Sequence, residues 1–191
     1  SREEAERCIR IHNPQPAGRL GVDASVPVML HCVVPHVADF RREYPAISLE
    51  LTSNDRIVDL IEHRTDVALR MGPLNDSTLH ARPMRPRPRW LMASPEYLAR
   101  RGVPRTVEDL ASHELLGFTQ PESLNVWPLR HAGGSTYLAT PTLATSSGET
   151  QRHLALRGVG IACLSDFVSR DDLREGRLVR IMEDLHTDYL Q

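Results

Sequence analysis

The sequence predicts an α/β fold in which short apolar strands alternate with helices, and three observations support this prediction. Residues 18–71 show a strand–helix–strand–helix–strand order of apolar patterns. An arginine- and proline-rich stretch at residues 82–89 then interrupts all periodicity. Residues 90–182 resume the alternation, with recognisable start and stop residues at the helices. Such alternation favours mainly parallel sheets flanked by helices, here in two successive lobes.

Composition is that of an ordinary globular protein. The chain has 191 residues, 40% of them hydrophobic, and a formal net charge of −2. This length is enough for two lobes of about 80–100 residues each. No basic excess of the kind that marks a DNA-binding domain is visible. All 23 basic residues are arginine, which excludes lysine Schiff-base and Walker-type lysine chemistry.

The first lobe is expected to contain three strands and two helices. In chain order we predict a strand at 19–23, a helix at 24–42, a strand at 47–51, a helix at 55–64 and a strand at 67–71. Pro35 lies inside the first helical pattern, where it favours a kink. The strand at 67–71 is continuously apolar until Arg70, as expected of a strand covered on both faces.

The second lobe is expected to begin with a strand at residues 90–93. Further strands are predicted at 115–118, 137–143, 159–164 and 178–182, and helices at 94–102, 106–112, 146–157 and 165–174. Ser94 followed by Pro95 is a typical helix start, and Gly158 is a typical helix stop. Residues 119–135 read as a polar loop around Trp127. The four arginines of residues 82–89 could contact nucleic acid, but a solvated crossover stiffened by its prolines is the preferred interpretation.

No motif in the sequence predicts catalysis or a bound metal. There is no Gly-x-Ser-x-Gly elbow and no His-Glu-x-x-His motif, and the three cysteines are scattered. Gly158-Val159-Gly160 follows a helix and precedes a strand, which is the reverse of a phosphate-binding loop. We therefore predict no catalytic residues, no metal ligands, no cofactor and no enzyme activity. No apolar run is long enough to span a membrane.

Small hydroxyl side chains follow several predicted strands, and they are the first candidates for a binding site. Ser25 follows the first strand, and Thr52-Ser53 follows the second. Ligands of open α/β folds lie beyond the carboxyl ends of parallel strands, where helix starts favour polar or anionic groups. Ser146-Ser147-Gly148 offers the same arrangement in the second lobe. Plain helix capping is the alternative for each residue, and Ser25 and Thr52 are expected to do both.

Arg70, Asn125 and Trp127 are further candidates. A charge that ends an apolar strand is costly unless it is paired. Arg70 could hold a ligand carboxylate, but internal pairing, for example with Asp66 or Glu149, is slightly favoured. Asn125 and Trp127 could line a ligand cleft from the second lobe, with core packing the preferred role for the tryptophan.

The segment 54–82 closely resembles the effector-binding region of LysR-type transcriptional regulators. The family pattern is a helix carrying "VDL" that leads into "DVALR-G-L-DSSL-AR". Here the matching positions are Val58-Asp59-Leu60, Asp66 to Arg70, Gly72, Leu74, Asp76-Ser77, Leu79 and Ala81-Arg82. Further matches are Ala93-Ser94-Pro95-x-Tyr97-Leu98, Gly102-x-Pro104, Leu110-x-x-His113, Trp127, Gly158-x-Gly160-Ile161-Ala162 and Gly176-x-Leu178-Val179. The resemblance spans about residues 18–184.

This resemblance implies a two-lobed fold of the type 2 periplasmic-binding-protein kind, with a small metabolite held between the lobes. Lobe I would span residues 18–82 and lobe II residues 83–187. Residues 1–17 would form the linker from an absent DNA-binding domain, and 188–191 the start of the return crossover to lobe I. The expected effector-binding residues are Ser25, Val26, Thr52, Ser53, Arg70, Asn125, Trp127, Ser146, Ser147 and Gly148.

The resemblance also implies partners and a cellular location. These are a polar or anionic small-molecule effector, operator DNA contacted through an N-terminal helix-turn-helix outside this sequence, and a second copy of the chain in a homodimer or homotetramer. No membrane contact is expected, and the protein is expected to be cytoplasmic. A solute-binding protein of a transport system, which shares this fold, is the alternative.

Three residues depart from the family pattern. Arg64 stands where glycine is usual at a helix C-terminus, and Ser165 stands where proline is usual. We expect these two to affect local stability only. Asn125 stands where relatives often have a basic residue, and this departure puts any ligand identity inferred from relatives in doubt.

Overall fold

The computed structural model describes residues 15–53, 64–70, 82–83 and 85–187. Its contacts divide the chain into two compact units, Ser1–Arg70 and Met71–Gln191, here called lobe one and lobe two. The expected helix at 55–64 lies outside the described residues except for Arg64, and so does most of the expected linker. The predicted lobe boundary after residue 82 adjoins the segment 71–81, also outside the described residues, and its position stays a prediction.

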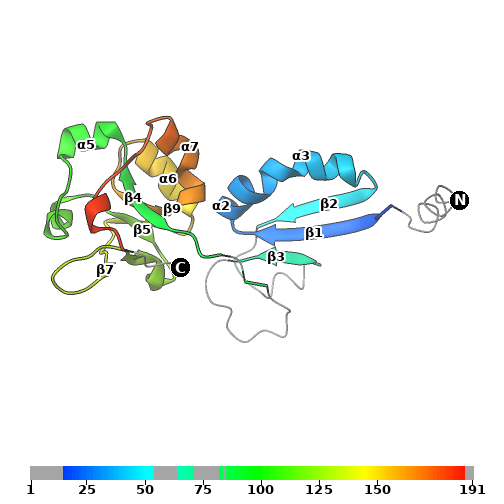
Figure 1. Ribbon diagram of the computed structural model, residues 1–191, viewed down its shortest axis with the longest axis horizontal. Coiled ribbons are helices and arrows are strands. Elements are labelled where there is room, and N and C mark those ends of the chain that lie inside the picture. Colours follow the sequence, from blue (N-terminus) through cyan, green and yellow to red (C-terminus); the bar gives the residue numbers. More distant parts are fainter. Residues whose placement is uncertain (1–14, 54–63, 71–81, 84, 188–191) are drawn as a thin grey trace, which may run out of the picture. The chain divides into compact units, whose positions relative to one another are not determined.

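Lobe one is built on a parallel sheet with the strand order β2-β1-β3 (Figure 1). Its described strands are β1 (Gly18–Ala24), β2 (Ile47–Thr52) and β3 (Val67–Leu69). The register places Asp23 of the central strand beside Thr52 on one side and Ala68 on the other. The carboxyl ends of the three strands therefore meet at one edge of the sheet, as the sequence predicts.

The helical segment after β1 is interrupted. It consists of α2 (Val26–Val28), the π-helical stretch η1 (Met29–Val33) and α3 (Val34–Glu43). Pro35 has no N–H to donate to the preceding turn, and the π-helical stretch lies directly before the turn that contains it. The irregularity predicted at Pro35 is therefore present, as a change of helix type rather than as one continuous helix.

Strand β3 is less covered than its apolar sequence suggests. Val67 is 44% exposed, and Ala68 is also exposed, so the prediction of a strand buried on both faces is wrong for the described structure. Among the described strands β3 lies at the edge of the sheet, and the helix expected before it falls outside the described residues. Arg64, just before β3, has a φ of 53°, the conformation that favours the glycine usual at this position.

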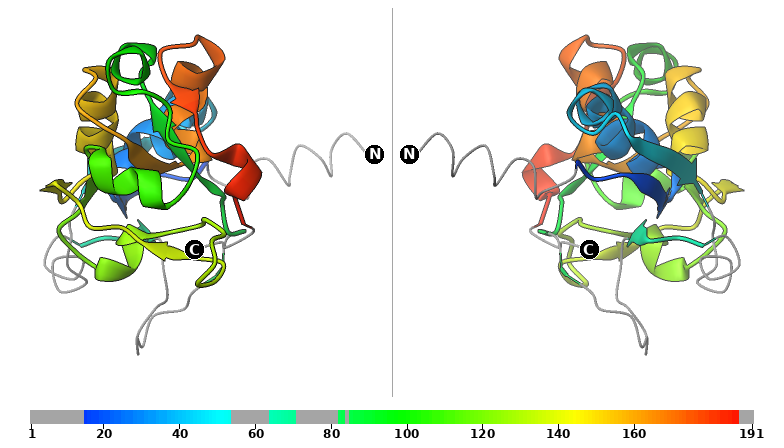
Figure 2. Two further views of the ribbon diagram at one scale, coloured as in Figure 1. Left: turned by 90° about the vertical axis from the view of Figure 1, so that its left-hand side faces the viewer. Right: turned by 90° about the vertical axis from the view of Figure 1, so that its right-hand side faces the viewer.

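Lobe two contains a larger set of elements. In chain order they are β4 (Arg89–Ala93), α5 (Pro95–Arg101), η2 (Glu108–Ser112), β5 (Leu116–Phe118), η3 (Glu122–Asn125), β6 (Val126–Trp127), β7 (Tyr137–Leu138), β8 (Leu143–Thr145), α6 (Gly148–Leu156), β9 (Ala162–Ser165), α7 (Asp166–Arg174), β10 (Val179–Arg180) and η4 (Glu183–Leu185). Figure 2 shows α5, α6 and α7 gathered at one end of this lobe, away from β7.

The sheets of lobe two are mixed rather than mainly parallel. Strand β4 pairs antiparallel with both β9 and β10, whereas β5 and β8 pair in parallel. Alternation of strands and helices constrains only strands joined by a single helix. Because β4 and β9 are separated by several other elements, their relative direction could not be read from that rule.

The expected polar loop at 119–135 contains a short strand. Strand β6 pairs antiparallel with β7, and its Trp127 is almost fully buried in the core formed with Leu91, Tyr97, Leu110 and other residues. A second core cluster lies around Met92, Leu116 and Leu164.

The arginine-rich crossover at residues 82–89 is not wholly solvated, because two of its arginine side chains contact other parts of lobe two. The Arg87 guanidinium pairs with Asp166, and buried Arg89 donates hydrogen bonds to the carbonyl oxygens of Leu124, Val126 and Cys163.

Candidate functional site

Three polar side chains of lobe one meet at the carboxyl ends of its strands. Asp23 is the penultimate residue of the central strand, and its side chain is completely buried, at 0% exposure. The Thr52 hydroxyl at the end of β2 donates a hydrogen bond of 2.5 Å to Asp23 Oδ2. Arg70, directly after β3, donates from Nη2 to Asp23 Oδ1 at 2.5 Å. Adjacent parallel strands bring these residues together although they lie far apart in the sequence.

The partner of Arg70 differs from the two that were suggested from the sequence. Arg70 pairs internally, as favoured, but with Asp23 rather than with Asp66 or Glu149. Asp66 instead accepts a hydrogen bond from the Gly21 N–H at 2.7 Å. The ion pair explains how a charged residue can follow an apolar strand, because each charge offsets the burial cost of the other.

Ser25, Val26 and Ser53 lie beside this cluster along the chain. Ser25 is the N-cap residue of α2, and it is exposed with no side-chain capping hydrogen bond. Val26, at the first helical position, is also exposed, and so is Ser53 directly after β2. The Ser25 hydroxyl is therefore not used for capping, in contrast to the double role predicted for it.

In lobe two the predicted residues lie at the start of α6. Ser147 is the N-cap residue, and its hydroxyl accepts a hydrogen bond of 3.2 Å from the Glu149 N–H. Ser146 is exposed, whereas Gly148 is buried at the first helical position. For Ser147 the capping role is thus present.

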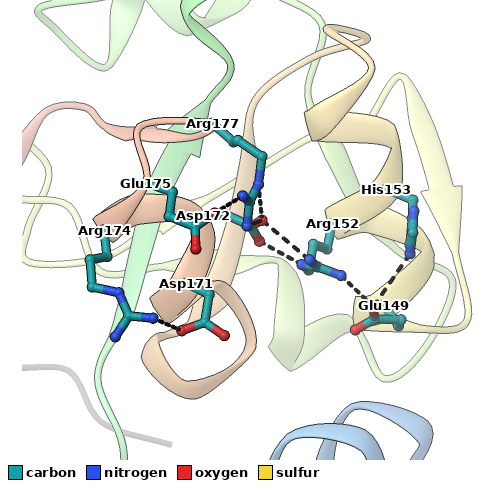
Figure 3. Close-up of polar contacts among 8 residues, drawn as sticks. All are labelled: Glu149, Arg152, His153, Asp171, Asp172, Arg174, Glu175 and Arg177. Atoms are coloured by element: carbon teal, nitrogen blue, oxygen red, sulfur yellow. Dashed lines mark hydrogen bonds and ion pairs between the residues drawn. The ribbon is translucent and has the colours of Figure 1, made fainter.

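A network of charged side chains connects α6 with α7 and with the residues that follow α7 (Figure 3). Buried Asp172 accepts hydrogen bonds from Arg152 at 2.5 and 3.2 Å and from Arg177 at 2.9 Å. Arg152 also donates to Glu149 at 2.6 Å. Burial alone would raise the pKa of Asp172, but the hydrogen bonds and charges of the two arginines outweigh it and hold the pKa below its ordinary value. Through Arg152 and Asp172 the network joins α6 to α7.

Asn125 and Trp127 have structural contacts in lobe two. The buried Asn125 side chain accepts from the Phe118 N–H at 2.8 Å and donates to the Phe118 carbonyl oxygen at 2.9 Å. Trp127 belongs to the core cluster, which is the role preferred for it from the sequence. The side-chain amide of Asn125 thus joins the end of η3 to the backbone of Phe118, the last residue of β5. These contacts do not direct Asn125 or Trp127 toward a ligand.

The predicted site residues therefore fall into two groups, one in each lobe. Lobe one brings Thr52 and Arg70 together on Asp23, with Ser53 next to Thr52 in sequence and Ser25-Val26 shortly after Asp23. Lobe two holds Ser146, Ser147 and Gly148 at one helix start. Asp23 is the residue that the sequence analysis missed. Its signal was a carboxylate at the end of an apolar strand, the same reasoning that had selected Arg70.

Two negative findings concern the part of the chain that the structure describes. Its histidine, cysteine, aspartate and glutamate side chains form no group of three or more that could hold a metal ion. Its helices are all too short or too polar to cross a membrane.

Comparisons with known proteins give a consistent result. A family model described as the LysR substrate binding domain matches residues 13–189. The HTH-type transcriptional regulator CrgA of Neisseria meningitidis serogroup B is 44% identical over 173 residues, which cover 91% of this chain and 58% of the regulator. The chain thus spans somewhat more than half the length of this relative. The HTH-type regulator DmlR of Escherichia coli is 29% identical over 90% of this chain and 56% of its own length.

Solved structures agree with the sequence comparisons. The regulatory domain of CrgA, a LysR-type transcriptional regulator from Neisseria meningitidis, matches with a TM-score of 0.86 at 44% identity and covers 92% of this chain and 86% of its own. The regulatory domain of AphB from Vibrio vulnificus matches with a TM-score of 0.71 at 28% identity, covering 90% and 87%. The expected two-lobed α/β fold is confirmed by these neighbours, and the chain belongs to the LysR substrate-binding-domain family.

Proposed function

We propose that the chain is the effector-sensing domain of a LysR-type transcriptional regulator and that the strand ends of lobe one recognise the effector. The observation that carries this proposal is the convergence of Thr52 and Arg70 at the carboxyl edge of a parallel sheet. The Ser25 hydroxyl, at the start of the helix that follows β1, makes no capping hydrogen bond. For lobe two, taken by itself, we propose Ser146, Ser147 and Gly148 at the start of α6 as recognition residues.

The proposed mechanism is a shift between conformations of the regulator. A small molecule that binds one arrangement of the domain more tightly than another shifts the population toward it, and only this difference in affinity can drive the change. In a full-length regulator the change would alter how paired helix-turn-helix domains sit on operator DNA. The names of the relatives support this role. A cytoplasmic location, where the DNA lies, is part of the same proposal.

Binding and regulation, rather than turnover, is the proposed activity. The relatives that the comparisons identify are transcriptional regulators, and the transport-protein alternative has no support among them. No catalytic cluster was predicted from the sequence.

A thermal-shift screen of metabolites tests the proposed site. A compound present at about 100 times its dissociation constant should stabilise the chain by about 2.7 kcal/mol. The combined replacements Ser25→Ala and Thr52→Val should remove most of this stabilisation, because they delete the two hydroxyl groups that we place against the ligand.

Ser48→Ala is the matched control, since Ser48 is an exposed hydroxyl residue near the start of β2, away from the strand ends. Its ligand-induced stabilisation should equal that of the wild type. Full stabilisation in the Ser25/Thr52 double variant would show that the effector binds elsewhere.

We also propose that the chain self-associates through lobe one. Leu30 and Val34, one helical turn apart, are 45% and 46% exposed. A groove of about 580 Å³ between α3 and β2 is lined by Val37, Ile47, Leu49 and Leu51 together with Arg41, Pro45, Ala46 and Ser48. Strand β2 is an edge strand among the described strands. Exposed apolar side chains beside an unpaired strand edge are typical of a protein-binding face. A second copy of this chain is the proposed partner, because LysR-type regulators are expected to form oligomers.

Light scattering after size-exclusion chromatography tests this self-association. The wild-type chain should run as at least a dimer, and Leu30→Glu should shift it toward monomer because a charge would be buried in the interface. Val103→Glu, a change at an exposed valine of lobe two, should leave the mass unchanged. A wild-type chain that stays monomeric at high concentration would contradict the proposal.

A further inference from the structure

Asp23 occupies the centre of the proposed effector site in lobe one. It lies one residue before the end of β1, the middle strand of the described sheet, and its buried carboxylate accepts hydrogen bonds from Thr52 on one side and Arg70 on the other. No sequence motif assigned it a role. Its contacts show which donors and charges of Thr52 and Arg70 are already in use.

The Thr52 hydroxyl proton is committed to Asp23. A carboxylate paired with a guanidinium is ionised and can only accept hydrogen bonds, so the 2.5 Å contact with Asp23 Oδ2 must use the single proton of the Thr52 hydroxyl. The Thr52 oxygen then has only lone pairs to offer to another group. A ligand that contacts Thr52 must therefore donate a hydrogen bond to it.

The charge of Arg70 is likewise already balanced. Its guanidinium lies 2.5 Å from Asp23 Oδ1, and the two side chains together carry no net charge. A ligand carboxylate that approached Arg70 and Thr52 would also approach the carboxylate of Asp23. Water is excluded from Asp23, so the repulsion between the two like charges would be only weakly screened.

We infer that Asp23 determines the specificity of the lobe-one site at Thr52 and Arg70. This site accepts an uncharged hydrogen-bond donor, a carboxamide or a hydroxyl, and rejects a carboxylate. The inference rests on the proposed function, because it assumes that the effector contacts Thr52. The sequence analysis left open whether the effector is polar or anionic. The inference specifies an uncharged group where the effector contacts Thr52.

The test is an NMR titration of the chain with acetamide and acetate, and with the larger pair benzamide and benzoate. The backbone N–H signals of Val26, Val28 and Thr52 report on the site. In the wild type, the amide of each pair should bind more tightly than the acid by about tenfold or more. Asp23→Asn removes the charge and frees Arg70, and this variant should instead favour the acids.

Asp66→Asn is the matched control. It makes the same charge change in lobe one at the start of β3, and its side-chain oxygen can still accept from the Gly21 N–H. It should keep the wild-type preference for the amides. Thr52→Val, which removes the acceptor without changing charge, should weaken the amides and leave the acids weak.

The outcomes separate this inference from the proposed function. Equal or tighter binding of the acids to the wild type, with shifts at these three signals, would overturn the inference and leave the site in place. Shifts that avoid these signals, or that Thr52→Val does not reduce, would overturn both. The wild-type comparison needs no variant, so the inference can be refuted even if Asp23→Asn does not fold.

Discussion

Replacing Asp172 with asparagine should destabilise lobe two substantially. The Asp172 side chain is 1% exposed and is held by Arg152 and Arg177, whose side chains are 18% and 46% exposed. The substitution removes the negative charge and leaves the partly buried Arg152 beside a neutral amide. Glu149 remains as a second partner for Arg152, at 2.6 Å, and limits the loss.

The expected cost can be worked from these contacts. Removing one partner of a buried ion pair typically costs about 3–5 kcal/mol, and a hydrogen bond to a charged group contributes about 1.5–3 kcal/mol. Arg177 can regain water, and the asparagine oxygen can still accept one hydrogen bond. We therefore expect a loss of about 3 kcal/mol in the free energy of unfolding, at the lower end of that range.

Urea unfolding followed by tryptophan fluorescence measures this loss in the relevant lobe. The chain has two tryptophans, Trp90 and Trp127, and both belong to lobe two. With a slope of about 1–3 kcal/mol per molar urea, the midpoint should fall by roughly 1–3 M.

The neighbouring residue supplies the control. Asp171 pairs with Arg174 at 2.8 Å, but both side chains are more than two-thirds exposed, at 68% and 69%. Asp171→Asn should cost less than about 0.5 kcal/mol, because exposed pairs contribute little. Equal, small effects of the two substitutions would refute the reasoning that burial makes the Asp172 network stabilising.

Two further predictions concern buried polar groups of lobe two. Gln151 is buried, and among the residues that the structure describes neither polar atom of its side chain has a hydrogen-bond partner. Gln151→Leu should therefore raise the free energy of unfolding by about 1–2 kcal/mol in the same urea experiment, and a loss of similar size would contradict this. Burial, and to a smaller extent the charge of Arg101, lowers the pKa of His113, whose Nδ1 is hydrogen-bonded to the Tyr97 hydroxyl at 2.7 Å. The folded state therefore favours neutral histidine, and stability should fall as pH drops below about 6.5, where the unfolded chain gains the proton first. Unfolding curves at several pH values should show this loss reduced in His113→Asn; an unchanged pH dependence would count against it.

Features with a local sequence signal were predicted well. The start of α5 at Ser94, whose hydroxyl accepts from the Tyr97 N–H, and its end at Gly102 follow from capping preferences alone. The three strands of lobe one and their common edge followed from the alternation of strands and helices. The family resemblance, carried by long motifs, gave the fold that the comparisons confirm.

Features that depend on distant pairing were not predicted. The two-residue strand β6 exists because it pairs with β7 across a loop, and its own residues carry too short a pattern to reveal it. The antiparallel pairing of β4 with β9 is likewise invisible in local sequence. The partner of Arg70 depends on the register of β1 and β3, which places Asp23 beside Ala68, and this register emerges only when the sheet is assembled.

A crystal structure of the chain with its effector bound tests the central claim most directly. The account predicts a ligand atom within hydrogen-bond distance of Thr52 Oγ1 and a second near the Ser25 hydroxyl, at the carboxyl ends of β1 and β2. A ligand bound with full occupancy and no contact to either residue would contradict it.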